Sequence, residues 1–111
     1  MNWKRRYFIL VDGVNFEYYT DTSRTVLKGK YCLSACCEVK IVPRSSTSGP
    51  TEFLFSIEDK RLKTSNYLGA DTEEDRIQWI EMLKENINEL EQHRISRLRK
   101  TETEYDGSRI Q

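Results

Sequence analysis

The sequence predicts a mainly β domain that a single C-terminal α-helix closes. Three observations predict this class: short apolar runs separated by polar turns up to about residue 70, helical spacing of apolar residues from about residue 71, and a tryptophan, Trp79, inside that helical segment. With 111 residues, the chain can form one domain with a modest core but not two. We therefore expect a small, bent β-sandwich or barrel of about six strands, capped by a helix.

The first three strands are predicted between residues 3 and 33. Residues 7–11 are aromatic or branched, and the Asp12-Gly13 pair that follows is typical of a tight hairpin turn. Residues 14–19 alternate apolar and polar side chains, which indicates an antiparallel strand with one buried face. A polar turn at 21–23 then leads to a third strand at 26–33.

Three more strands are predicted before the helix. Residues 37–42 alternate again and stop at Pro43, which cannot donate to a sheet ladder. A loop rich in Ser, Thr and Gly is expected at 44–50. Strands at 52–57 and 65–70 follow, joined by a charged turn at 58–61.

The last segment has the period of an amphipathic helix. Its apolar residues recur at spacings of three and four, which places them on one helix face; they are Ile77, Ile80, Leu83, Ile87 and Leu90. Asp71 and Glu74 have the spacing of a capping box, so the helix is expected to start at about residue 71.

Side chains of the helix are expected to complete the hydrophobic core. Trp79, Ile80 and Leu83, with Met82 as a further candidate, would close the open end of the bent sheet. Residues 1–92 are therefore predicted to form the domain, and residues 93–111 a helix extension followed by a disordered tail. Beyond Lys100 no apolar period is present, and a frayed end is expected there.

The charges are balanced but unevenly distributed. Lys plus Arg and Asp plus Glu both number 18, so the formal net charge is zero, which argues against a general nucleic-acid binder. Residues 1–30 nevertheless carry six basic and three acidic residues. A neutral chain can therefore have a cationic pole.

The cysteines and the apolar runs indicate a compartment. Cys32, Cys36 and Cys37 are odd in number and clustered, which suits free thiols in a reducing cytosol. The longest apolar run, residues 7–11, is far shorter than the about 20 residues that span a bilayer, and no apolar leader opens the chain. We expect a cytoplasmic protein that associates peripherally with membranes if it binds lipid.

Taken in order, these segments resemble the pleckstrin homology (PH) domain family, whose seven-strand bent sandwich is closed by one C-terminal helix with a characteristic Trp. The segments that carry the resemblance are residues 3–10 (WKRRYFIL), 16–19 (FEYY), 28–29 (KG), 67–70 (YLGA) and 79–80 (WI). The resemblance begins at the family's second strand, so the family's first strand, its Lys and the following loop have no counterpart here. A fragment, a truncated product and a strand borrowed from another chain are all compatible with this pattern.

The resemblance implies a phosphoinositide headgroup site. Members that bind these lipids carry a basic-x-Arg motif on the second strand, and Lys4 and Arg6 match it; the resemblance further implies contacts from Tyr18 and Lys28. Because side chains alternate along a strand, Lys4 and Arg6 share one face and Arg5 points away, where a weaker, non-specific membrane contact is expected. The expected partner is a phosphoinositide-containing membrane surface.

Catalysis, metals and cofactors have no motif in this chain. His93 is the single histidine, and one histidine with a Cys-x3-Cys-Cys cluster lacks usual zinc-ligand spacing. No phosphate-cradling Gly-rich loop or nucleophile elbow is present. We expect a non-catalytic adaptor module that binds phosphoinositides, without metal or cofactor. The alternative is a protein-interaction module of the same fold, which would use an exposed strand edge or the long helix.

Overall fold

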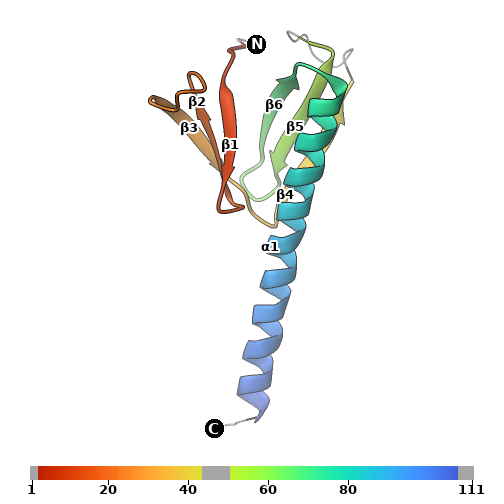
Figure 1. Cartoon of the computed structure of the whole chain (residues 1–111). Coiled ribbons are helices and arrows are strands. Elements are labelled where there is room, and N and C mark those ends of the chain that lie inside the picture. The colour runs from red at the N-terminus through yellow and green to blue at the C-terminus, as the bar shows by residue number, and fades with distance from the viewer. Residues whose placement is uncertain (1–2, 44–50, 108–111) are drawn as a thin grey trace.

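The computed structural model describes residues 3–43 and 51–107, with side chains described as far as Ser96. The predicted loop at 44–50 and residues 108–111 lie outside the described residues. Six strands form two antiparallel three-stranded sheets, and one long helix, α1, packs against the second sheet (Figure 1). The predicted class, a mainly β sandwich with one C-terminal helix, is confirmed.

The first sheet, called sheet A here, contains β1 (Tyr7–Val11), β2 (Asn15–Tyr19) and β3 (Leu27–Cys32) in that order. The Asp12-Gly13 hairpin turn is confirmed: both residues have positive φ, at 56° and 71°, as a type I′ turn requires. A cross-strand pair, Phe8 with Tyr18, faces the sandwich interior. Within the described residues, β1 pairs with β2 along one edge and with no strand along the other.

The second sheet, sheet B, contains β4 (Cys37–Val42), β5 (Phe53–Asp59) and β6 (Thr64–Ala70). The charged turn predicted at 58–61 joins β5 to β6 as expected but starts later, because β5 continues to Asp59. The carboxylate of Asp59, 7% exposed, accepts hydrogen bonds from the backbone N–H groups of Arg61 (2.9 Å) and Leu62 (3.2 Å). This side chain therefore holds the turn from the end of the strand.

The core lies between the two sheets and one face of the helix. Phe16 of sheet A is 1% exposed, and Leu54 and Leu83 are fully buried. On the helix Ile80 and Ile87 are also buried, while Trp79 is half-buried with its ring centroid 5.3 Å from that of Phe16. Met82, the further core candidate, is 37% exposed and lies outside the core.

Helix α1 (Glu73–Gly107) starts and ends differently from the sequence prediction. Its N-cap is Thr72, whose Oγ1 accepts a hydrogen bond of 3.1 Å from the backbone N–H of Asp75. The predicted Asp71–Glu74 capping box was therefore wrong. The helix also continues past Lys100, where a frayed tail was predicted, to Gly107. Residues 101–106 contain neither Gly nor Pro to interrupt it. The division of the chain near residue 92 stays a prediction.

The apolar stripe of the helix is shorter than predicted. Ile77 is 45% exposed, because the neighbouring Arg76 covers sheet B at this point. The Arg76 guanidinium donates to the Leu54 carbonyl at 3.2 Å and lies 5.8 Å from the centroid of the Phe53 ring. A paired arginine, with Glu73 as its partner at 2.6 Å, takes the place expected for an aliphatic side chain.

Candidate anion-binding site

The basic segment 3–6 connects the two sheets. The ring of Trp3 lies over Gly69 of β6. If this glycine carried a Cβ atom, that atom would be 3.9 Å from Cζ3 of Trp3. Arg5 pairs with Asp71, just before α1, through two hydrogen bonds of 2.6 and 3.1 Å. Arg5 therefore already has a carboxylate partner, and its predicted membrane contact stays a prediction.

The Arg5–Asp71 pair is exposed, with 83% and 55% of the two side chains accessible. The Arg5 guanidinium lowers the pKa of the Asp71 carboxyl, first through the hydrogen bond and then through its charge. A lowered folded-state pKa means that the contribution of this pair is present at neutral pH and is lost as the pH falls through the folded-state pKa of Asp71. Solvent screening keeps that contribution small.

Lys4 and Arg6 differ from Arg5 in having no acidic partner in the part of the chain that the structure describes. Among the residues that the structure describes, no carboxylate lies within 4 Å of either cation, and Arg6 Nη1 donates to the Arg5 carbonyl at 3.0 Å. The expectation that Lys4 and Arg6 lie on the first strand was wrong, because β1 starts at Tyr7 and residues 3–6 precede it; their shared face stays a prediction. Both cations stand beside the end of the sandwich where β1 begins.

Tyr18 is held in an aromatic row on the inner face of sheet A. Its ring centroid lies 5.3 Å from that of Phe8 and 5.5 Å from that of Tyr31. Its hydroxyl lies directly over Gly29, the residue opposite it on β3. Burial raises the pKa of the Tyr31 hydroxyl, and the electrostatic interaction with Tyr18 raises it further. Tyr18 is thus a packing residue whose polar end reaches the edge strand.

Gly29→Ala should destabilise the domain by about 1–3 kcal/mol, the usual cost of adding a methyl group to a well-packed site. A Cβ there would lie 2.3 Å from the Tyr18 hydroxyl oxygen and 2.6 Å from Cζ. Urea unfolding would measure the loss, and Tyr18→Val in the same chain should recover part of it. An unchanged midpoint would contradict this placement of Tyr18.

Lys28 lies at the same end of sheet A as Lys4 and Arg6. The register pairs Tyr7 with Tyr19 and Tyr19 with Leu27, so the start of β1, the end of β2 and the start of β3 come together. Lys28 follows Leu27 at the irregularity in the β2–β3 ladder, and its side chain is exposed. The fold therefore brings the predicted headgroup residues Lys4, Arg6, Tyr18 and Lys28 to one end of one sheet.

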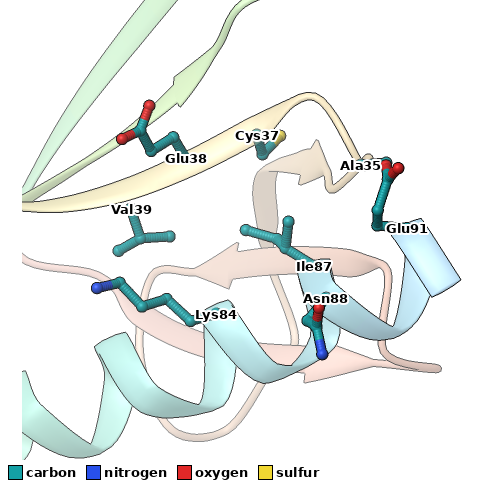
Figure 2. A pocket seen from close by; sticks show the side chains of 8 residues that line it. All are labelled: Ala35, Cys37, Glu38, Val39, Lys84, Ile87, Asn88 and Glu91. Carbon is teal, nitrogen blue, oxygen red and sulfur yellow. The ribbon is translucent and has the colours of Figure 1, made fainter.

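Two cavities of the described structure lie away from this end of sheet A. The larger, about 370 Å³, lies between β4 and α1; Figure 2 shows its lining, which is Ala35, Cys37, Glu38, Val39, Lys84, Ile87, Asn88 and Glu91. Two carboxylates and one amine make it a poor site for a polyanion. Both carboxylates are already paired, Glu38 with Lys60 at 3.2 Å and Glu91 with Arg94 at 2.6 Å.

The second cavity, about 270 Å³, lies where the β1–β2 turn meets the helix and includes Asp12, Glu89 and His93. In the described part of the chain, no three His, Cys, Asp or Glu side chains are arranged to hold a metal ion. The three cysteines are free thiols, and Cys37 Sγ lies 3.9 Å from a carboxylate oxygen of Asp59. No described helix is both long and apolar enough to cross a bilayer.

Sequence reasoning missed Thr72 as the N-cap and gave Asp71 the wrong role, that of a capping residue and not of a partner of Arg5. Asp71 binds Arg5 across 66 positions, which no local pattern reveals. Thr72 with Asp75 was detectable, because Thr is a favoured N-cap residue with its N3 partner three positions later.

Comparison with known proteins agrees with this architecture. The profile of the family described as "PH domain" matches residues 1–88. The chain is 33% identical over 87 residues to Protein daughter of sevenless of Drosophila melanogaster; the match covers 70% of this chain and 9% of the relative. The match thus concerns a small part of a much longer protein. With its six antiparallel strands, its closing helix and this match over most of its length, the chain belongs to the PH domain family.

Proposed function

We propose that this PH domain is a non-catalytic module that binds phosphoinositide headgroups at the cytoplasmic face of a membrane. Lys4 and Arg6 are the main contacts, and Lys28 and Tyr18 support them. Family membership supports the general role of a lipid- or protein-binding module. The observation that carries the finer proposal is the distribution of unpaired cations over the described structure.

Of the seven cations outside sheet A whose side chains the structure describes, five are paired and two, Lys63 and Lys84, are not. Each of the five lies within 4 Å of a carboxylate: Lys40, Lys60, Arg61, Arg76 and Arg94. On and beside sheet A, only Arg5 has such a partner among the described residues, and five cations have none: Lys4, Arg6, Arg24, Lys28 and Lys30. Four of these five cations, all except Lys30, lie at the end of sheet A where β1 begins, and this concentration of positive charge favours an anionic ligand there.

The residue types suit phosphate. The guanidinium of Arg6 can donate two parallel hydrogen bonds to phosphate oxygens, while the ammonium of Lys4 acts as a compact charge. The Tyr18 hydroxyl, at the inner face of the same end, can donate one more. Two cations with a hydroxyl nearby match a headgroup that carries several phosphates.

The test is sedimentation of the whole chain with vesicles of neutral lipid, with and without phosphoinositide, at two salt concentrations. We expect binding that depends on the phosphoinositide and weakens as salt increases, because the contacts are between exposed charges. A folded chain that stays in solution with every vesicle would refute the proposal.

A second candidate function is protein binding by strand addition at β1. Among the described strands, none pairs with one edge of β1, which carries the uncharged residues 7–11. Such an edge can accept an extended peptide through backbone hydrogen bonds. Such binding would change little with salt, so the same salt series separates the two functions.

A further inference from the structure

Residues 3–6 hold their positions without the support of a sheet ladder. β1 starts at Tyr7, and none of residues 3–6 belongs to a described strand. The two main contacts of the proposed headgroup site, Lys4 and Arg6, both lie in this segment. Contacts other than backbone pairing therefore have to keep these two cations where one ligand can meet both.

Two contacts attach the segment to the far side of the molecule, one on each side of Lys4. Before Lys4, the ring of Trp3 lies over Gly69, near the end of β6. After it, the Arg5 guanidinium donates hydrogen bonds of 2.6 and 3.1 Å to the two carboxylate oxygens of Asp71. The start of β1, the end of β6 and the start of α1 lie at the same end of the molecule (Figure 1). Lys4 thus stands between two attachments to β6 and to the residue that follows it.

Asp71 is a fixed point for the Arg5 contact. It directly follows Ala70, the last residue of β6, which pairs with Phe53 of β5. It directly precedes Thr72, the N-cap of α1. The backbone at Asp71 is therefore held by a strand on one side and by a helix on the other. Two parallel hydrogen bonds to one carboxylate then give the Arg5 guanidinium a single defined orientation.

A further hydrogen bond carries this constraint to Arg6. Nη1 of Arg6 donates to the backbone carbonyl of Arg5 at 3.0 Å. In the described part of the chain, this is the one hydrogen bond of the Arg6 side chain, and no carboxylate lies within 4 Å of it. The contacts therefore run from the Asp71 carboxylate through Arg5 to the Arg6 guanidinium. A shift of Arg5 would move the group that holds Arg6 and the backbone next to Lys4.

We propose that Asp71 is a positioning residue for the headgroup site: its ion pair with Arg5 fixes the segment that carries Lys4 and Arg6, so that both cations meet the same ligand. This inference rests on the proposed function and adds to it a residue that does not touch the ligand. The sign of its effect is diagnostic. The charge of a carboxylate beside a cationic site weakens the binding of an anion, whereas a carboxylate that orders the site strengthens it.

The variant Asp71→Asn separates the two effects, because it removes the charge and nearly keeps the size of the side chain. It should bind vesicles of phosphatidylcholine that contain phosphatidylinositol bisphosphate about fivefold more weakly than wild type, the effect expected of an exposed ion pair with good geometry. If the charge alone mattered, this variant would bind more tightly than wild type. Asp71→Glu keeps the carboxylate that Arg5 binds and should recover most of the affinity.

Glu74→Gln is the matched control for the loss of one negative charge. Glu74 is also exposed at the start of α1, and it has no ion pair among the described residues. This variant should bind as tightly as wild type or slightly more tightly. The melting temperatures of all these variants should differ little, because solvent screens the exposed Arg5–Asp71 pair.

The order of the segment is measured independently, without ligand, by limited digestion with trypsin and mass spectrometry. Cleavage after Lys4, Arg5 and Arg6 should be faster in Asp71→Asn than in wild type, and cleavage after the exposed Arg24 should be unchanged. Wild-type binding that Asp71→Asn retains or exceeds overturns the positioning role and leaves the proposed function standing. A wild-type chain that stays in solution with every vesicle overturns both.

Discussion

Leu83→Ala should destabilise the domain by about 3–5 kcal/mol, as removal of a fully buried leucine leaves a cavity that the surrounding side chains fill in part. Leu83 has no exposed surface and belongs to the cluster that joins the helix to both sheets, with Phe16 and Phe55 among its members. A small domain has about 5–15 kcal/mol of stability in total. One truncation should therefore remove a large part of it.

The measurement is urea unfolding followed by tryptophan fluorescence, since Trp79 packs against Phe16 and reports on the core. Met82→Ala is the control on the same helix, because Met82 is 37% exposed and should cost far less. If Leu83→Ala does not fold, Leu83→Met, which nearly conserves volume, should fold with a loss below about 1.5 kcal/mol. Equal midpoints for Leu83→Ala and Met82→Ala would contradict the position of Leu83 in the core.

The double variant K4A/R6A should bind phosphoinositide vesicles about a hundredfold more weakly than wild type. Each hydrogen bond between a charged side chain and phosphate contributes about 1.5–3 kcal/mol, and every 1.4 kcal/mol changes affinity tenfold. Neither cation has a carboxylate partner in the described structure, so their removal should leave the melting temperature nearly unchanged. Vesicle sedimentation and thermal unfolding measure the two effects separately.

The chain offers two controls. K63A/K84A also removes two exposed cations without carboxylate partners, but from the β5–β6 turn and the helix. It should keep most of the binding. Arg5→Ala removes one charge from the same basic segment and should have a smaller effect on binding, because the Arg5 guanidinium is occupied by Asp71. If K63A/K84A loses as much as K4A/R6A, net charge governs binding and the site is wrong.

The strands and the helix were predictable because their signals are local. The bounds of β1 and β4 agree with the apolar runs at 7–11 and 37–42. The hairpin after β1 follows from Asp12-Gly13, where positive φ is favourable. The helix face follows from a spacing of three and four residues, which the buried Ile80, Leu83 and Ile87 share.

The errors arose where a side chain acts on a distant or unexpected partner. Asp59 reads as a turn residue by type, yet it ends β5 and caps the turn with its carboxylate. Ile77 was predicted in the apolar stripe, yet it is 45% exposed, and Arg76 beside it lies over Phe53 and donates to a β5 carbonyl. Propensity and period describe one residue among its neighbours in sequence, and these contacts join different elements.

The candidate site divides in the same way. The residue types, a basic segment ahead of an apolar strand, follow from the sequence alone. Which of these cations lack a carboxylate partner among the described residues depends on how the sheets and the helix pack. The tertiary structure pairs Arg5 with Asp71, 66 positions away, and it places Leu27 beside Tyr19 through strand register. Ion pairs and surface patches depend on distances in space, and those are set when the two sheets and the helix pack together.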